Sequence, residues 1–230
     1  MADNLPQHIA IIPDGNRRWA ARKGVPNIEG HQTGADRMHN VVEWLIPLGI
    51  KYLTVWGFST DNWKRTSDEV QSLFKVLQLW IEKDTPWLHE NNVRLKHIGR
   101  LQELPVGLQE AIGQAVALTG HNSGMTLNLA FNYTGRAEIV DAVRRLIADG
   151  APWELVDEQM VNHNLYMNGT PDVDLVIRTA DEFRLSNFML WQTAYSEYYF
   201  TPVFWPDFDA IELEKALKSY SERKRRFGGD

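Results

Sequence analysis

Two stretches near opposite ends of the chain carry the residue types that bind phosphate groups. In the first, the apolar run 8–12 leads into five small, polar or charged residues, Asp14, Gly15, Asn16, Arg17 and Arg18. A strand that ends in a glycine turn and feeds a helix leaves backbone N–H groups free to bind an anion. Asp14 would repel that anion, so we expect Mg²⁺ to bridge Asp14 to a diphosphate. In the alternative reading, Asp14 is a helix cap and the arginines are solvated.

The second stretch follows another apolar run, 173–177, and contains Arg178, Arg184 and Ser186. The guanidinium fork of arginine matches phosphate oxygens, and serine adds a hydroxyl donor. The carboxyl ends of parallel strands lie at one edge of a sheet, where open α/β folds bind ligands. Either arginine alone could be a surface salt bridge. The two loops together favour a site for two phosphorylated ligands.

A third polar loop follows the strand-like run 52–58 and contains Ser59, Asn62 and Arg65. At the same sheet edge, these residues could handle a proton or position a phosphate opposite Asp14. They could also be ordinary turn residues. The run 132–136 extends the same rim after a fourth strand.

The elements that must position these loops alternate along the chain. Strand-like runs lie at 8–12, 52–58, 93–98, 126–131 and 173–177, and helical patterns at 32–48, 68–91, 105–119, 135–149, 157–165 and 209–226. Strands rich in Val, Ile and Leu that alternate with helices predict a mostly parallel sheet with helices on both faces. We therefore expect an α/β fold and one domain over residues 1–230.

Composition narrows the classes of function. The net charge of −6 argues against a nucleic-acid partner, and the absence of cysteine fits a reducing, cytoplasmic location. No apolar run approaches the roughly 20 residues of a membrane span, so we expect at most peripheral membrane contact. The nine Trp and nine Phe residues suit a core and also pockets for hydrocarbon ligands.

With these residues assembled, the chain resembles the cis-prenyltransferase family, the family of undecaprenyl diphosphate synthase. The resemblance covers nearly the whole length and rests on several blocks of sequence: 8–20, 30–31, 58–65, 91–95, 132–136, 174–188, 191–192, Glu197, 205–208 and 225–229. It implies an enzyme that ionises an allylic diphosphate and joins it to a second isoprenoid diphosphate, with Mg²⁺ as cofactor.

The resemblance also implies roles for individual residues. Asp14 matches the aspartate that holds Mg²⁺, and Glu197 matches an acidic residue that supports the metal. The implied contacts of the allylic diphosphate are Gly15, Asn16, Arg18 and His31, with Arg17 and Trp19 in the same motif. Asn62 matches a residue that positions or deprotonates the second substrate, beside Ser59, Trp63 and Arg65. Arg178, Arg184 and Ser186 match the residues that bind the diphosphate of the second substrate. Arg226 and Gly228 match a C-terminal motif that enters the partner's site in a homodimer.

The chain departs from the family pattern in both diphosphate sites. Pro13 and Arg17 replace the usual Met and Gly, and Asn27 stands where an arginine contacts the allylic diphosphate. Asp181 replaces a glycine and places a negative charge beside the second cradle. Phe183 replaces a His or Gln that could bind a metal or donate a hydrogen bond. These changes indicate either neutral drift or an altered substrate pair or product.

The leading hypothesis is a Mg²⁺-dependent synthase that joins C5 diphosphates, dimethylallyl or isopentenyl, into a short product. Trp56 and Phe131 could close the hydrophobic tunnel early, or could be ordinary core. The rewritten diphosphate sites make irregular, lavandulyl-type coupling a serious option. One alternative is a regular cis-polyprenyl diphosphate synthase, and a second is a non-catalytic partner subunit.

Overall fold

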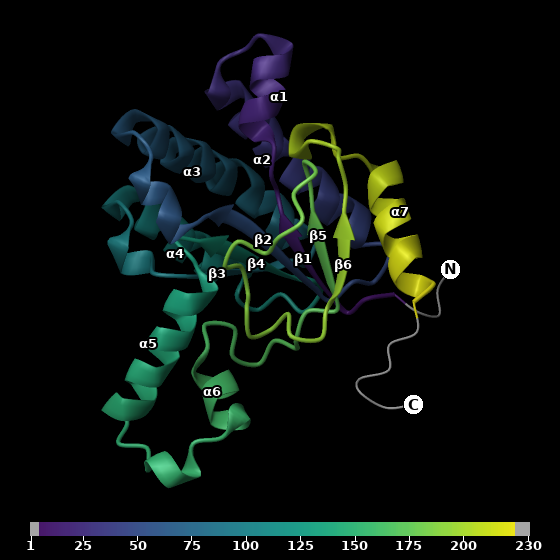
Figure 1. Ribbon diagram of the computed structural model, residues 1–230. Helices are drawn as coiled ribbons and strands as arrows, with labels where there is room; N and C mark the ends of the chain where they lie inside the picture. Colours follow the sequence, from purple (N-terminus) through teal and green to yellow (C-terminus); the bar gives the residue numbers. More distant parts are fainter. Residues whose placement is uncertain (1–4, 224–230) are drawn as a thin grey trace.

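A six-stranded parallel sheet forms the centre of the computed structural model, which describes residues 5–223. The strand order is β3-β4-β2-β1-β5-β6, and every neighbouring pair is parallel. The strands are β1 (His8–Ile12), β2 (Tyr52–Phe58), β3 (Arg94–Ile98), β4 (Thr126–Phe131), β5 (Leu175–Arg178) and β6 (Glu197–Phe200). The predicted α/β fold is confirmed (Figure 1).

The α-helices fall between the strands as the sequence pattern predicts. They are α1 (Asn16–Lys23), α2 (Asn27–Leu45), α3 (Ser67–Glu90), α4 (Val106–Thr119), α5 (Gly135–Ala148), α6 (Glu158–Asn164) and α7 (Ala210–Ser221). Helices α5 and α6 pack together and extend away from the sheet as an arm (Figure 1).

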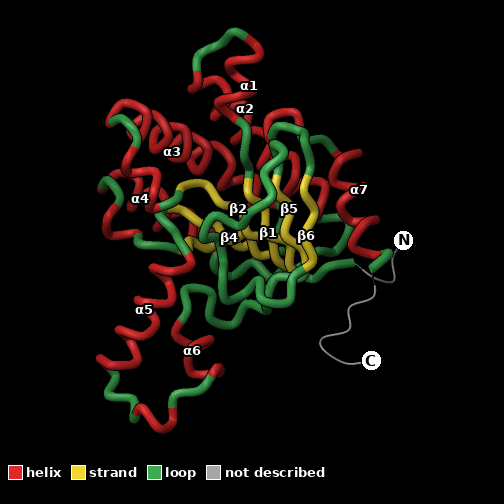
Figure 2. The backbone as a smooth tube through the Cα atoms, in the orientation of Figure 1, coloured by secondary structure: helices red, strands yellow, loops and turns green. Residues whose placement is uncertain are grey.

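The two faces of the sheet have separate apolar cores. One face presents Ile9, Ile11 and their neighbours to α2, α3, α4 and α7. The other presents Ala10 and Ile12 to a smaller core that includes Tyr133 and Phe188. Loops rather than long helices cover much of this second face (Figure 2). Residues alternate between the faces, as the pleat of a strand requires.

Two differences between the observed and the predicted elements affect the site. Strand β6 was not predicted, because its four residues, Glu197–Phe200, follow a loop and lack an apolar alternation. Helix α2 begins at Asn27 rather than at residue 32, directly after Pro26. Two glycines inside α2 obscured this start in the sequence. A Cβ at Gly30 would lie 2.3 Å from the carbonyl oxygen of Asn16, so glycine is needed where α1 and α2 meet.

Candidate active site

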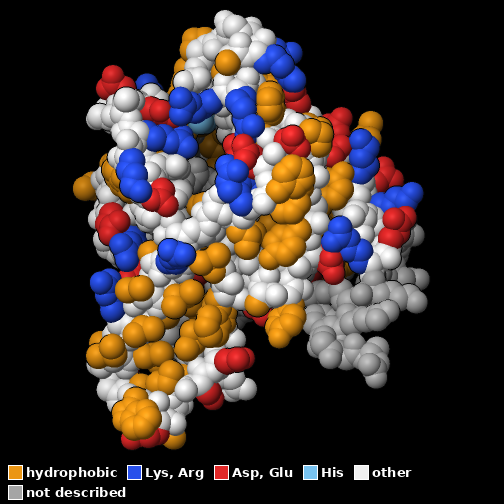
Figure 3. All heavy atoms as spheres, in the orientation of Figure 1, with side chains coloured by type: hydrophobic (Ala, Val, Ile, Leu, Met, Phe, Trp, Pro, Cys, Tyr) orange, Lys and Arg blue, Asp and Glu red, His pale blue; other side chains and the backbone are white. Residues whose placement is uncertain are grey.

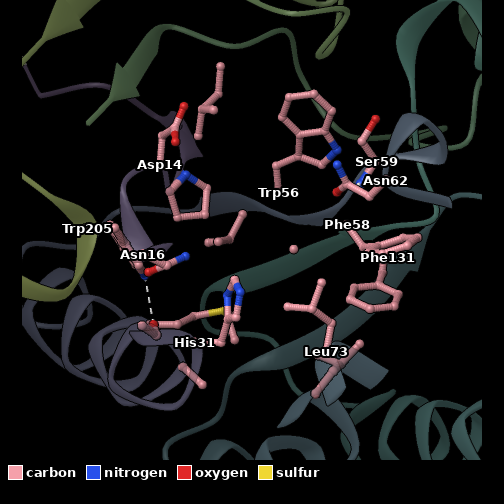
Figure 4. Close-up of a pocket in the computed structure, with 18 of the residues that line it drawn as sticks. Asp14, Asn16, His31, Trp56, Phe58, Ser59, Asn62, Leu73, Phe131 and Trp205 are labelled. Atoms are coloured by element: carbon pink, nitrogen blue, oxygen red, sulfur yellow. Dashed lines mark hydrogen bonds between the residues drawn. The ribbon is translucent and has the colours of Figure 1, made fainter. Parts of the chain in front are cut away.

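A cavity of about 340 Å³ opens at the carboxyl edge of the sheet and runs between the sheet and helices α2 and α3. Polar residues from the three predicted loops line its mouth. Apolar residues make up most of the rest of its lining. The predicted residues that line it are Asp14, Asn16, His31, Ser59, Asn62, Arg65, Arg178 and Ser186. The structure therefore brings together side chains from α2, from β5 and from the loops after β1, β2 and β5. Figure 4 shows Asp14, His31 and Asn62 around this cavity.

Asp14 lies at the centre of the polar mouth. Its Oδ1 accepts a hydrogen bond from the N–H of Gly15 at 2.7 Å and a longer one from Arg18 at 3.4 Å. Its Oδ2 accepts from Arg178 at 2.9 Å. The Thr179 hydroxyl contacts both the backbone N–H and the carbonyl oxygen of Asp14. This network fixes the carboxylate at the rim while leaving 34% of its side chain exposed.

Arg178 is the buried cation of the site, with a relative exposure of 3%. Besides Asp14, it donates to the Ser186 hydroxyl at 2.9 Å and to the backbone carbonyl of Arg184. Its Nε has no partner. A buried guanidinium needs a countercharge and filled donor positions, so Arg178 ties the Ser186 loop to the Asp14 loop.

A second, more polar recess adjoins the first at the start of α1. Pro13, Asp14, Gly15, Asn16, Arg17, Arg18, Ala21, Asn27, His31 and Arg65 line it. Gly15 adopts φ = 100° there, and a Cβ would lie 2.8 Å from Phe204, so only glycine fits this turn. Glu69 of α3 pairs with Arg65 at 3.0 Å and with Arg17 at 3.7 Å. The recess presents the start of a helix and several cations to an anion.

His31 lies between the two recesses and lines both. Its Nε2 is buried and has no hydrogen-bond partner. Burial, with a further effect from the charge of Arg65, lowers the pKa of His31 to about 4. The imidazole is therefore neutral at physiological pH and can accept or donate one hydrogen bond to a ligand.

The loop after β2 folds into a short 3₁₀ helix, Thr60–Lys64, that a capping box holds in place. The Ser59 hydroxyl accepts from the N–H of Asp61 at 3.1 Å, and Asn62 Oδ1 accepts from the N–H of Ser59 at 3.0 Å. The amide oxygen of Asn62 is thereby engaged, and its NH₂ group remains to face a ligand.

Large apolar side chains make up much of the cavity lining. They include Trp56, Phe58, Leu73, Leu77, Trp80 and Phe131. Phe131 stacks on Phe58 with 5.1 Å between the ring centroids, and Trp56 stacks on Phe188 with 4.9 Å between them. Both residues predicted to limit the tunnel therefore line it and also take part in aromatic packing. The indole Nε1 of Trp80 is buried without a partner.

Three predicted binding residues do not line either recess. Trp19 donates its indole N–H to Asp207 at 2.7 Å, and Trp63 donates to Asn132 at 2.8 Å, so both indoles brace the loops. The Arg184 side chain, 60% exposed, pairs with Glu182. Direct contacts of these three residues with substrate stay predictions.

The structure does not bring Glu197 to Asp14 within one chain. Glu197 is the first residue of β6 and pairs with Leu175, the first residue of β5. Arg178, which pairs with Ile12 at the end of β1, lies three residues further along β5. At roughly 3.3 Å per residue, this places Glu197 about 10 Å below the strand ends. Its carboxylate instead pairs with Arg223. The role of Glu197 in supporting a metal, which the resemblance implies, stays a prediction. Arg226 and Gly228 lie outside the described residues.

Two groups of site residues were missed in the sequence. Trp80, Met38 and Leu77 line the cavity, but their helical spacing marks only a buried face. Glu182 and Glu69 pair with the arginines of both recesses. The only indication in the sequence was that each glutamate is close along the chain to an arginine predicted to bind phosphate.

The mouth of the cavity offers one kind of ligand that Mg²⁺ prefers, a carboxylate. This ion is commonly held by one or two carboxylates together with substrate phosphates. Asp14 presents a partly exposed carboxylate whose oxygens keep lone pairs beyond the three contacts described above. Among residues 5–223, no group of three or more His, Asp or Glu side chains is arranged to hold a metal on its own. Within the same range, each helix is too short or too polar to cross a bilayer.

Comparison with known proteins gives one consistent result. The sequence profile described as "Putative undecaprenyl diphosphate synthase" matches residues 12–228. An isoprenyl transferase of Fusobacterium nucleatum is 49% identical over 229 residues, which span all of this chain and 98% of the relative. One from Thermotoga maritima is 47% identical over 98% of this chain and 97% of the relative.

Two solved structures share the fold. Lavandulyl diphosphate synthase from Lavandula x intermedia, in complex with dimethylallyl diphosphate, has a TM-score of 0.94 and 39% identity, covering 97% of this chain and 98% of that one. A probable undecaprenyl diphosphate synthase from Campylobacter jejuni has a TM-score of 0.84 and 32% identity, covering 98% and 99%.

Proposed function

This chain belongs to the cis-prenyltransferase family of prenyl diphosphate synthases, and we propose that it joins two C5 isoprenoid diphosphates into a short product. The small volume of the cavity and the bulky side chains that line it carry this proposal. At about 340 Å³, the cavity is at the low end of the roughly 300–1,000 Å³ of small-ligand pockets. Bulky side chains, among them Trp56, Trp80 and Phe131, line the cavity and limit the room for a long chain.

We favour irregular coupling of two dimethylallyl diphosphates. Lavandulyl diphosphate synthase, a neighbour in structure, was crystallised with dimethylallyl diphosphate. Asp181 and Phe183 alter the cradle of the second substrate, and Phe183 is 69% exposed and packs on Phe200. A changed cradle would present a different carbon of the second substrate to the reacting centre.

The reaction balances as follows. The C1–O bond of one dimethylallyl diphosphate breaks, and its electron pair leaves with diphosphate. C1 bonds to C2 of the second molecule's double bond, and the cation formed at C3 loses a proton from a methyl group. The products are one C10 diphosphate, one diphosphate and one proton.

The residues of the mouth suit the two charges of this reaction. Arg18 and the first turn of α1 face the leaving diphosphate, and Arg178 with Ser186 faces the diphosphate of the second substrate. Preorganised donors of this kind stabilise developing charge without reorganisation. The cavity's apolar walls exclude water from the carbocation. When bound, Mg²⁺ would supply further charge neutralisation to the leaving diphosphate, and Asp14 is the residue that would hold it.

The decisive experiment supplies each substrate alone and in pairs. Purified protein is incubated with Mg²⁺ and dimethylallyl diphosphate only, and the dephosphorylated products are separated by gas chromatography and mass spectrometry. We expect a C10 alcohol of irregular skeleton. If products form only with isopentenyl diphosphate and are long regular chains, irregular coupling is wrong.

A regular cis-polyprenyl diphosphate synthase is the second candidate. The curated relatives at 47–49% identity are isoprenyl transferases, and the Campylobacter jejuni structure is a probable undecaprenyl diphosphate synthase. The same assay with farnesyl and isopentenyl diphosphates would then give long products. No observation favours the non-catalytic partner subunit considered from the sequence.

We also propose that the protein is a homodimer that associates through the α5 arm. Side chains on α5 and the following turn are apolar and exposed: Val140, Val143, Ile147, Trp153, Leu155 and Val156. They gather on one face of the arm (Figure 3). Ile147 is 72% and Trp153 81% exposed, whereas contiguous apolar patches are rare on monomers.

The dimer is tested by light scattering after gel filtration. Ile147→Glu combined with Trp153→Lys should give a monomer, and Ile211→Lys, which changes an exposed side chain on α7, should leave a dimer. A dimer in both variants would place the interface elsewhere. A monomer for the unmodified protein would contradict the proposal itself.

The C-terminal residues give a further test of a shared site. Arg226 and Gly228 match a motif that reaches a partner's site, and deleting residues 224–230 keeps the Arg223–Glu197 pair. The truncated protein should show a raised KM for the second substrate with little change in melting temperature. An unchanged KM would refute a contact in trans. The cytoplasmic location, with at most peripheral membrane contact, stays a prediction.

A further inference from the structure

Glu182 bridges the arginines of the two predicted diphosphate cradles. Its Oε1 lies 3.1 Å from Nη2 of Arg18, and its Oε2 pairs with Nη1 of Arg184. Arg18 belongs to the cradle after β1, and Arg184 belongs to the loop after β5. The Glu182 side chain is only 21% exposed, so the carboxylate lies between the two cations rather than in open solvent.

The loop that carries Glu182 has an unfavourable backbone. Ala180 and Asp181 precede it with φ values of 72° and 59°, a left-handed conformation that costs energy for residues with a Cβ. Two backbone hydrogen bonds hold them there: Ala180 N–H donates to Val203 at 2.8 Å and Asp181 N–H to Thr201 at 2.9 Å. Strained backbone of this kind persists where the surrounding structure enforces it and is concentrated at functional sites. Here it fixes the carboxylate beside Arg18, which lines the second recess.

The N–H groups that Glu182 occupies are donors that a diphosphate would need. Each guanidinium offers five N–H donors in a fixed fork, and a carboxylate and a phosphate compete for the same pairs. A diphosphate bound to Arg18 and Arg184 would also repel Glu182, because no other cation in the ion pairs described contacts that carboxylate.

We propose that Glu182 is an internal anion that occupies both cradles and is displaced by the diphosphate of a substrate or product. It sets the affinity of the site for diphosphate, because binding must exchange one set of ion pairs for another. The same exchange speeds release of the diphosphate product, since the carboxylate returns to the arginines as the product leaves. This inference rests on the proposed function only for the identity of the organic substrates.

The direct test measures binding of inorganic diphosphate by titration calorimetry in the presence of EDTA, which removes divalent metal. Glu182→Gln keeps the shape of the side chain and removes its charge. We expect diphosphate to bind this variant about three- to tenfold more tightly, as the loss of partly exposed ion pairs implies. Asp36→Asn is the matched control, because Asp36 pairs with Lys83 on the exposed surface. It should leave the dissociation constant unchanged.

A second variant separates charge from structure. Glu182→Asp keeps the charge but shortens the side chain by one methylene, so its diphosphate affinity should lie between those of the unmodified protein and Glu182→Gln. Unchanged or weaker binding in Glu182→Gln would overturn the proposal, since it would make Glu182 a support for the arginines rather than a competitor. Melting temperatures check that all the variants are folded.

Steady-state kinetics give an independent readout. Glu182→Gln should lower KM for the diphosphate substrates and also lower kcat, because product diphosphate leaves more slowly. A structural role alone would raise KM or leave it unchanged. If the product assay fails to show prenyl coupling but the calorimetry shows tighter diphosphate binding, the proposed function fails and the role of Glu182 stands.

Discussion

Arg178 donates from Nη2 to Oδ2 of Asp14 at 2.9 Å and so joins two loops that are 164 positions apart in the sequence. The pair lies at the ends of the adjacent strands β1 and β5. Because Arg178 is almost fully buried, Asp14 is its principal countercharge as well as the predicted metal ligand. One carboxylate thus anchors the packing of the mouth and is also its predicted metal ligand.

Replacing Asp14 tests these two roles separately. Asp14→Asn keeps an oxygen that can accept from Arg178 but removes the charge. We expect kcat to fall by about 10²–10³, the usual effect of removing one preorganised electrostatic group. We expect stability to fall by about 1–3 kcal/mol, because Arg178 loses its countercharge. Steady-state kinetics and urea unfolding measure the two effects, with Asp36→Asn as control. Near-normal turnover would eliminate Asp14 as the metal ligand.

Trp80 offers a test of how product length is limited. Its indole N–H has no partner, so Trp80→Leu loses packing and volume but no hydrogen bond. The cavity should deepen between α3 and the sheet, and the products should include longer chains. Trp87→Leu is the control, because Trp87 lies on the same helix, packs on His39 and does not line the cavity. Equal product lengths in the two variants would show that Trp80 does not limit the chain.

Asp181 links backbone strain to substrate choice. Asp181→Gly removes a side chain from a residue at φ = 59° and should stabilise the protein by about 0.5–1 kcal/mol, after the entropy cost of glycine. Gly169→Ala is the control for the reverse change. Gly169 has φ = 78°, and no atom lies within 4 Å of where a Cβ would stand. The added Cβ therefore introduces only backbone strain and should lower the free energy of unfolding. Asp181→Gly should also lower KM for isopentenyl diphosphate, since it removes a charge beside the cradle. Thermal melts and kinetics measure the two effects.

His8 should make the protein sensitive to acid. Burial lowers its pKa to about 4, although hydrogen bonding to the Pro171 carbonyl acts in the opposite direction. The unfolded chain, with a pKa near 6.5, therefore binds the proton more tightly than the folded one. The contribution of His8 to the free energy of unfolding is therefore fully present above pH 6.5 and declines as the pH falls toward 4. The total loss from this one group is about 3 kcal/mol.

His8→Gln identifies the histidine's share of this effect. Glutamine can keep a donor and an acceptor toward Pro171 and Thr54, which contact the two ring nitrogens at 2.8 Å, but it does not titrate. Unfolding free energies at pH 7.5 and 5 should differ less in this variant than in the unmodified protein. His31 and His97, whose pKa values are also lowered to about 4, contribute to the remaining slope. An equal slope in the two proteins would contradict the effect.

The sequence allowed prediction of the sheet because β1, β2 and β4 are buried runs of apolar residues, each followed by a helical pattern. It did not allow prediction of β6, whose residues are all half-buried and whose pairing with β5 depends on tertiary contacts. Pattern alone cannot distinguish such an edge strand from a loop.

The candidate site was predictable where residues follow a strand directly. Asp14, Ser59, Arg178 and Ser186 come together because parallel strands end at one edge. The part of the cavity wall that α3 contributes was not predictable. Trp80 is 15 residues beyond Arg65, and the helical pattern identifies it only as buried. The ion-pair partners of Arg18 and Arg65 were not predictable either, because their contacts with Glu182 and Glu69 depend on the folded structure.

The position of β1 in the middle of the strand order has a consequence for synthesis of the protein. β1 emerges from the ribosome first and pairs with β2 early, but its other edge waits for β5, more than 160 residues later. Until then an unpaired edge of apolar residues is available to other chains. Such non-local pairing is slow and exposed to aggregation. We expect nascent chains that stall before Leu175 to depend on chaperones, and the mouth around Asp14 to be the last part of the molecule to form.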